Sequence, residues 1–482
     1  MAPRLRSYEA RPYWMRHLTG YVYIFLLSCT FAAIVAWNNQ QTYGQVSPVQ
    51  ALREVLGRTP PKGGNELRGI QEIISLDSPV STHRKDQNSA TFDPNDVLFM
   101  FKTSASTMWE RTPMHLATTF TNKTLTPDVV IYSDLDASIG GYRVIDVLAN
   151  VSTALKSHPD FEYYHQLKRP AGEHGLQVDG EDVHNPTLAG SWRIDKYKFL
   201  PLVQHAALNF PEKKWYVFLE DDSFIFIEPF MAWLAQSYDW REPTLAGSPA
   251  SSSAHGGSIF ALSQGAVRKS FLADPQLAEK WEEYSIQQRS GAQVLSHVLA
   301  TKGIKRAHNG EDDVAMPVRG LQDLGVAERN WCSPLLTLHR AHQSDLSALH
   351  AWGKDFGANK GKDVPPRYRD VFLDLISPHI NEMEREDWDN YADWKRIAPT
   401  ADVEYGEEIM EDERSSKMAW SSAGACKQAC KSEKPCMMWK YSDGICYLGE
   451  AVKRGRRSSS EVRVKSGWML DRIRDLEKNE CK

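Results

Sequence analysis

The chain has 482 residues, a formal net charge of −5 and 41% hydrophobic residues. A chain of this length exceeds one typical hydrophobic core, so we expect more than one domain. Acidic and basic residues are nearly balanced and dispersed along the chain. This charge distribution excludes the strongly basic surface typical of nucleic-acid-binding proteins, and no nucleic-acid partner is expected.

The amino terminus contains an uncharged segment, residues 20–37, which is long enough to cross a bilayer at the ~1.5 Å rise of a helix. Basic residues precede this segment at Arg4, Arg6, Arg11 and Arg16, and the next one follows only at Arg53. The positive-inside rule then places residues 1–19 in the cytosol and the remainder in the lumen. A cleaved signal peptide is the alternative, but no small-residue cleavage site follows. We expect a single-pass type II protein of the Golgi or ER–Golgi membrane.

Cysteines and glycosylation motifs agree with a lumenal chain. Cys29 lies in the expected membrane segment, and no partner can be assigned from sequence to Cys332 or Cys481. The other four are close together at Cys426, Cys430, Cys436 and Cys446. No histidine lies among them, so disulfides are favoured over a zinc site in an oxidising compartment. N-glycosylation sequons begin at Asn122 and Asn150.

Residues 38–94 are polar, contain paired prolines and glycines, and are typical of a stem. Apolar runs predict buried strands at 96–101, 127–132 and 215–219. Helical patterns are seen at 108–119, 143–155 and 192–208. Strands that alternate with helices predict an α/β fold with a mostly parallel sheet.

Three acidic residues, Glu220, Asp221 and Asp222, directly follow the strand at 215–219. Ligands of open α/β sheets bind beyond the carboxyl ends of the strands. In an extended chain Glu220 and Asp222 point to one side, and Asp221 points to the other. Carboxylates are the ligands that Mn²⁺ and Mg²⁺ prefer. A solvated acidic turn is the alternative, but the buried strand before these residues favours a metal site.

The stretch from Trp215 to Phe224 resembles the metal-binding strand of glycosyltransferase family 31, which includes the Fringe proteins and the core 1 β1,3-galactosyltransferases. Further segments agree with that family in order, namely 101–104, 132–134, 195–199, 255–258, 311–314, 331–334 and 338–339. The resemblance covers roughly residues 95–350. It implies a nucleotide-sugar-binding GT-A domain with a UDP-sugar as donor and a divalent cation, Mn²⁺ first, on the pyrophosphate.

The resemblance also implies roles for individual residues. Glu220, Asp222 and His339 match the metal ligands, although an isolated histidine would more often be structural. The positions that match donor contacts are Lys102, Thr103, Asp134, Lys196, Asp221, Gly256 and Gly257. Asp313 matches the general base, with Asp312 as the alternative; a solvated acidic loop is the other interpretation. The family's glycine after this acid is absent here.

Residues 351–415 are expected to connect to a second module, residues 416–482, which resembles a PAN/apple-like domain. That resemblance implies the pairs Cys426–Cys446 and Cys430–Cys436, and a protein or glycan partner. We expect reduction to melt this module and to leave the transferase domain folded. The basic run 453–457 either recognises an anionic partner or is a solvated loop.

The resemblance to glycosyltransferase family 31 thus implies an inverting, Mn²⁺-dependent β1,3-glycosyltransferase that acts on a glycan or glycoprotein hydroxyl. A degenerate transferase fold that serves as a carbohydrate- or protein-binding scaffold is the alternative. The identities of the donor sugar and the acceptor do not follow from these motifs, because a fold does not determine specificity.

Overall fold

The computed structural model describes residues 93–121, 128–168, 191–247, 259–307, 315–317, 319–399, 418–458 and 463–481. The expected membrane segment 20–37 and the stem up to residue 92 lie outside the described residues. Within the described ranges, no helix combines the length and the apolar character that crossing a bilayer requires.

The α/β part of the chain, residues 93–379, is built on an eight-stranded sheet. Strand β1 (Val97–Lys102) lies at its centre, between β2 (Asp128–Ser133) and β5 (Trp215–Glu220), and is parallel to both. Every residue of β1 is buried, which is typical of a parallel strand covered on both faces. The prediction of an α/β fold with a central parallel sheet is confirmed.

Antiparallel pairs extend the sheet on both sides of this centre. β4 (Tyr142–Asp146) is parallel to β2, and β3 (Ala137–Ile139) is antiparallel to β4. Beyond β5, the antiparallel strands β8 (Phe260–Ser263) and β7 (Thr244–Gly247) follow in space, and β9 (Lys305–Arg306) forms the edge. The sheet is therefore mixed, with its parallel core at β4, β2, β1 and β5.

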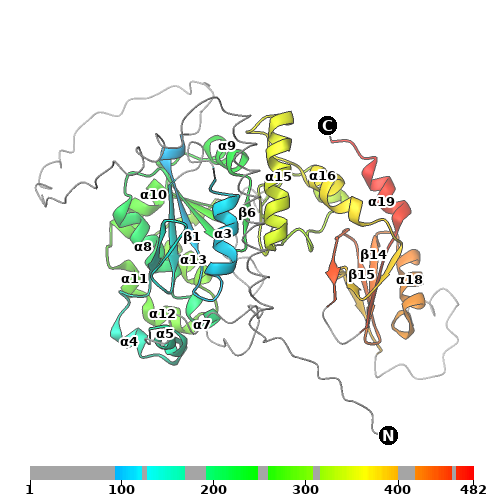
Figure 1. Cartoon of the computed structure of the whole chain (residues 1–482), viewed down its shortest axis with the longest axis horizontal. Helices are drawn as coiled ribbons and strands as arrows, with labels where there is room; N and C mark the ends of the chain where they lie inside the picture. Colours follow the sequence, from blue (N-terminus) through cyan, green and yellow to red (C-terminus); the bar gives the residue numbers. More distant parts are fainter. Residues whose placement is uncertain are drawn as a thin grey trace, which may run out of the picture. The chain divides into compact units, whose positions relative to one another are not determined.

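Helices flank the sheet, which stands between α3 (Met108–Ala117) and α8 (Phe199–Asn209) in Figure 1. The long helix α15 (Gln343–Lys360) packs against α3. The remaining helices of this part are α4 (Thr153–Lys156), α5 (Glu162–Leu167), α7 (Ser191–Asp195), α9 (Ile227–Ser237), α10 (Gln264–Val267), α11 (Leu277–Lys280), α12 (Glu282–Gln287), α13 (Gly291–Thr301) and α16 (Tyr368–Val371).

Two of the predicted helices are wrong in part. Residues 143–155 begin as strand β4 and become helical only in α4, because Val144 and Ile145 are β-branched and pair with β2. The helix predicted at 192–208 is split into α7 and α8. Pro201 explains the break, since its ring would clash with the carbonyl of residue 197 in a continuous helix.

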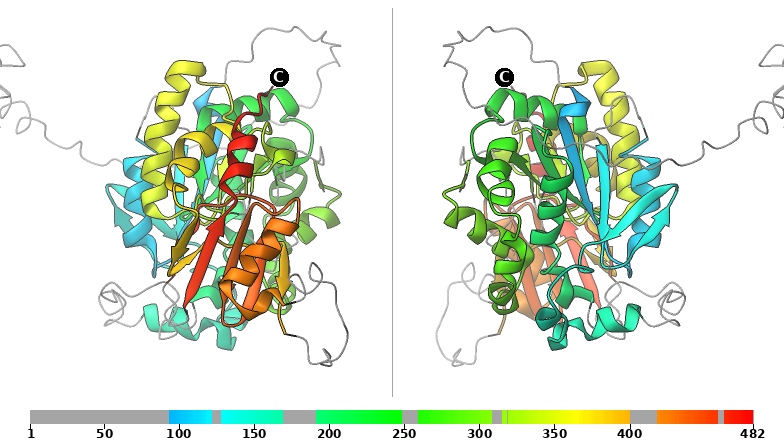
Figure 2. Two further views of the ribbon diagram at one scale, coloured as in Figure 1. Left: turned by 90° about the vertical axis from the view of Figure 1, so that its right-hand side faces the viewer. Right: turned by 90° about the vertical axis from the view of Figure 1, so that its left-hand side faces the viewer.

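The C-terminal module, residues 384–481, contains a five-stranded antiparallel sheet. Its strands, in spatial order, are β11 (Glu384–Glu386), β17 (Val464–Trp468), β14 (Met438–Ser442), β15 (Ile445–Gly449) and β13 (Lys395–Ile397). Helix α18 (Ala423–Ser432) lies across one face of this sheet (Figure 2), and α19 (Leu470–Glu477) ends the module. A two-stranded sheet joins β12 (Trp388–Asp389) to β16 (Arg456–Arg457). Three of these strands, β11, β12 and β13, come from the segment 351–415, expected to be only a connection, so the module begins upstream of residue 416.

Three disulfides lie within the described residues. Cys426–Cys446 and Cys430–Cys436, the pairs that the family resemblance implies, link α18 to β15 and to the residues before β14. The third, Cys332–Cys481, joins the α/β part to the chain's C-terminal end, across 149 residues of sequence. Sequence gave no indication of this bond.

One hydrophobic cluster spans the α/β part and the C-terminal module. It contains Phe224 and Trp331 from the former, and Val452, Trp468 and Leu476 from the latter. Because these side chains bury one another, loss of the module would expose apolar surface of the α/β part. The packing therefore favours joint unfolding, contrary to the expectation that reduction melts the module alone.

We predict that Gly467→Ala destabilises the protein. A Cβ at Gly467 would lie 2.4 Å from the indole nitrogen of Trp439, whose side chain is buried. Overpacking of this kind costs about 1–3 kcal/mol. In the matched control, Gly424→Ala, the new methyl group meets only the Ser422 hydroxyl at 3.8 Å, at an exposed position of helix α18, and stability should rise by up to ~1 kcal/mol. Urea unfolding followed by tryptophan fluorescence measures both, and a wild-type midpoint for Gly467→Ala would contradict the packing.

Candidate functional site

The acidic residues form a tight turn at the end of β5. The amide of Ser223 donates to the carbonyl of Glu220 at 3.0 Å, and β6 (Phe224–Ile225) follows. The amide of Asp221 donates to the carbonyl of Lys102 on β1, at 3.1 Å. The turn therefore lies at the carboxyl end of two parallel strands, where α/β sheets bind their ligands.

His339 reaches this turn through the pairing of two short strands. β10 (Thr337–Leu338) is antiparallel to β6, with Leu338 opposite Phe224. His339, the residue after β10, therefore lies beside the acidic turn that precedes β6. The amide of Ala341 also donates to the carbonyl of Asp222, at 2.7 Å.

The three predicted metal ligands are brought together. Nε2 of His339 lies 2.9 Å from Oε2 of Glu220 and 3.2 Å from Oδ1 of Asp222. One ligand atom from each residue lies within 4.8 Å of the others. Nδ1 of His339 is buried and makes no hydrogen bond with the described residues. Two carboxylates and one imidazole fit a hard divalent cation, which keeps further positions for other oxygen ligands.

The charge states of Glu220, Asp222 and His339, which we call the triad, follow from their geometry. Burial disfavours the charged form of His339, but Coulomb attraction to Asp222 and hydrogen bonds to Asp222 and Glu220 outweigh it and raise the pKa of His339 to about 10. Burial likewise opposes ionisation of Asp222, yet the charge of His339 lowers the pKa of that carboxyl. Without a cation, an imidazolium neutralises the carboxylates. A metal ion would take over this role and displace the proton.

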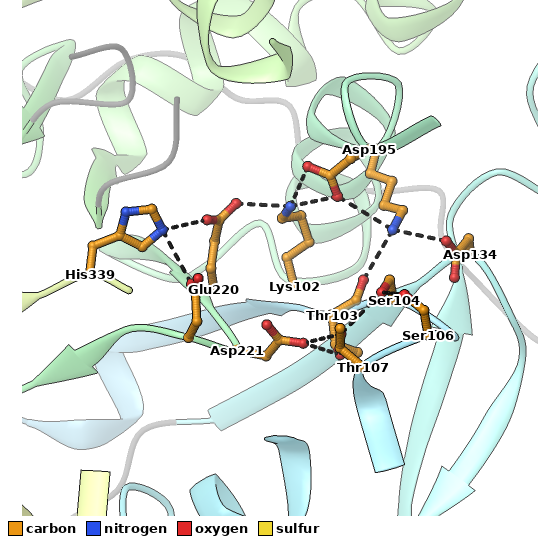
Figure 3. A network of polar contacts seen from close by, with 12 residues as sticks. Lys102, Thr103, Ser104, Ser106, Thr107, Asp134, Asp195, Glu220, Asp221 and His339 are labelled. Carbon is orange, nitrogen blue, oxygen red and sulfur yellow. Dashed lines mark hydrogen bonds and ion pairs between the residues drawn. The ribbon is translucent and has the colours of Figure 1, made fainter. Parts of the chain in front are cut away.

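A row of side chains with alternating charges extends from Glu220 of the triad to Asp134, at the end of the neighbouring strand β2 (Figure 3). Nζ of Lys102 lies 2.8 Å from Glu220 and 2.6 Å from Asp195. Nζ of Lys198 lies 3.4 Å from Asp195 and 3.0 Å from Asp134. Burial opposes the charge on Lys102, but Asp195 and Glu220 raise its pKa, so the lysine stays protonated. The site therefore contains both positive and negative side chains before any ligand binds.

Asp221 points away from the triad, as the alternation of an extended chain predicts. Its Oδ2 accepts hydrogen bonds from Thr103 at 2.6 Å and Thr107 at 2.5 Å, and Arg111 lies 3.1 Å from its Oδ1. Its backbone carbonyl, 3.0 Å from Nε2 of buried His115, can only accept, so that nitrogen carries the proton. These contacts hold the acidic turn in place.

The other expected donor contacts divide into three groups. Lys102 and Thr103 lie in the network around the turn, and Asp134 is fully buried beneath Lys198. Lys196 lies elsewhere, with its Nζ 2.8 Å from the carbonyl of Ile286 and 3.2 Å from Asp160. Gly256 and Gly257 lie outside the described residues, and so do the two candidates for the general base, Asp312 and Asp313.

Sequence reasoning missed Asp195, Lys198 and Arg111 as members of the site. The first two were visible as an acid and a base three positions apart, in a segment that resembles the family. Arg111 lies on α3, and a single arginine in a helical pattern does not indicate a functional site. A search of protein-family models and of curated proteins found no match to this chain.

We predict that Lys198→Met lowers the free energy of unfolding by about 3–5 kcal/mol, because it leaves the fully buried carboxylate of Asp134 without its cationic partner. Lys280→Met removes an ion pair to Asp274 in which the lysine is 56% exposed, and should cost less than ~1 kcal/mol. Adding Asp134→Asn to Lys198→Met should recover part of the loss. Denaturant unfolding measures all three, and equal losses for the two lysine variants would refute the buried pairing.

Proposed function

We propose that the chain is a glycosyltransferase that uses a UDP-sugar and a divalent cation, Mn²⁺ first, to glycosylate a hydroxyl of a glycan or glycoprotein. The observation that carries this proposal is the convergence of Glu220, Asp222 and His339 at the carboxyl end of the central parallel strands. The ordered resemblance to glycosyltransferase family 31 supports it. That resemblance also favours an inverting β1,3 transfer.

The residues around the triad have distinct roles in this proposal. When bound, the cation neutralises the charge that develops on the departing diphosphate. Lys102, 2.8 Å from Glu220, adds a fixed positive charge at the same edge of the sheet. Asp221 orients the turn through Thr103 and Thr107. Asp313, or Asp312 next to it, removes the proton of the acceptor hydroxyl.

The proposed placement is lumenal, in a type II membrane protein of the Golgi or ER–Golgi. The uncharged segment 20–37 and the arginines before it support this topology. Asn150, the acceptor residue of one sequon, is exposed in a turn and is accessible to glycosylation. A binding scaffold without activity is the second candidate, favoured by the missing glycine after Asp313 and by the appended cysteine-containing module. The intact triad favours the enzyme.

We predict that UDP binds only together with a divalent cation. Calorimetry should show UDP binding with Mn²⁺ and none with EDTA, because without the cation the imidazolium of His339 is already paired with the two carboxylates and the triad offers a diphosphate no electrophilic partner. Asp222→Ala should abolish the cation-dependent binding, whereas Asp239→Ala, a change at an exposed ion pair with Arg241, should not. Equal affinity for UDP in Mn²⁺ and in EDTA would contradict the proposed site.

We also predict that Asp313→Asn slows sugar transfer by about 10²–10⁴-fold, the usual contribution of a general base. The amide keeps the size of the carboxyl group but does not accept the proton. Affinity for UDP with Mn²⁺ should be unchanged, since the triad is intact. Asp312→Asn should have the smaller effect. Transfer rates that neither change lowers would remove this pair from the mechanism.

A further inference from the structure

The segment that carries His339 is held from two sides. We call residues 319–341 the His339 loop. On the side of the α/β part, its strand β10 pairs with β6, and the amide of Leu336 donates to the carbonyl of Ala315 at 2.7 Å. These bonds bring His339 to the acidic turn. They involve only the last part of the loop.

The first half of the loop pairs with the C-terminal module instead. Val326 and Val452 exchange both backbone hydrogen bonds, at 2.9 and 2.7 Å, and the amide of Gly455 donates to the carbonyl of Gln322 at 2.8 Å. The loop therefore makes strand-like contacts with the module over several residues.

Charged side chains reinforce this contact. Lys453, which is 7% exposed, lies 3.0 Å from Asp323 of the loop. Arg454 lies 2.9 Å from the buried carboxylate of Asp345, at the start of α15. The basic run 453–457 thus uses two of its cations within the molecule, where sequence had suggested an anionic partner or a solvated loop. Buried pairs of this kind enforce a specific arrangement of the segments they join.

The end of the chain is attached to the centre of the loop. The indole nitrogen of Trp331, in a buried side chain, donates to the carbonyl of Asn479 at 2.9 Å. The next residue, Cys332, is bonded to Cys481. Only seven positions separate Cys332 from His339. The covalent link therefore acts close to the metal ligand.

The backbone at His339 needs such support. Arg340, the following residue, has φ of 58°, a left-handed conformation that costs a non-glycine residue about 1–3 kcal/mol. Gly320 packs under it, because a Cβ at that position would lie 2.2 Å from the carbonyl oxygen of Arg340. Such a conformation persists only where the surrounding contacts enforce it.

We propose that the C-terminal module is a positioning element of the cation site, and that the Cys332–Cys481 bond fastens the loop that presents His339. This inference rests on the proposed function in one respect, namely that the triad binds a divalent cation. Supporting contacts of metal ligands typically change metal affinity by about 10–100-fold. Loss of the bond should loosen His339 while both carboxylates stay on the turn after β5.

The test measures Mn²⁺ binding to the whole protein by electron paramagnetic resonance, with pulsed detection of the ¹⁴N coupling from a bound imidazole. The double variant Cys332→Ser/Cys481→Ser should bind Mn²⁺ at least about tenfold more weakly, with a reduced ¹⁴N signal. The matched control, Cys430→Ser/Cys436→Ser, removes a disulfide from a hydrophobic cluster that does not include the loop, and should bind as wild type does. His339→Ala marks complete loss of the ¹⁴N signal.

Trp331→Phe provides a second variant, in case the double serine variant does not fold; it keeps an aromatic ring and both cysteines and removes the hydrogen bond to Asn479. It should weaken Mn²⁺ binding in the same direction. Wild-type affinity and ¹⁴N signal in the loop variants would overturn the inference and leave the proposed function standing. Equal losses in the loop variants and the control would also overturn it, since general destabilisation would then be the cause. Absence of Mn²⁺ binding by the wild type would overturn both.

Discussion

The candidate site depends on one pairing, that of β6 with β10. Two residue pairs, Phe224 with Leu338 and Ile225 with Thr337, align segments that are more than a hundred positions apart in the sequence. Because β6 begins just after the acidic turn and β10 ends just before His339, antiparallel pairing places imidazole and carboxylates together. A parallel arrangement would place them at opposite ends. The chemistry of the site therefore follows from strand direction.

Charge balance is the second constraint. Glu220 is shared between His339 and Lys102, and the row continues through Asp195 and Lys198 to Asp134. Each buried charge has a neighbour of opposite sign, which offsets the cost of removing it from water. A cation that binds the triad takes the place of the imidazolium proton as the positive charge beside the carboxylates. The net charge of the site therefore changes little when the cation binds. This compensation explains how such a polar centre is kept at the edge of an apolar sheet.

The parts that sequence predicts well are those that local physics determines. Continuous apolar runs identified β1, β2 and β5, and alternation along the chain predicted that Asp221 faces away from Glu220 and Asp222. The ordered motifs singled out His339, far away in sequence. Local reasoning failed where a non-local contact or a single residue decides. Pro201 breaks a helix, and sheet pairing makes 142–146 a strand. Cys332 and Cys481 meet only because the module folds back onto the His339 loop.

The central claim is that Glu220, Asp222 and His339 form one cation site that holds a nucleotide diphosphate. Crystals of the α/β part with its C-terminal module, grown with UDP and Mn²⁺ and measured at the manganese absorption edge, test it most directly. The account predicts one anomalous peak at coordination distance, about 2.0–2.3 Å, from an oxygen of Glu220 or Asp222 and from Nε2 of His339, with the diphosphate on its open side. An ordered UDP with no anomalous peak at this triad, or a peak bound by other residues, would contradict the account.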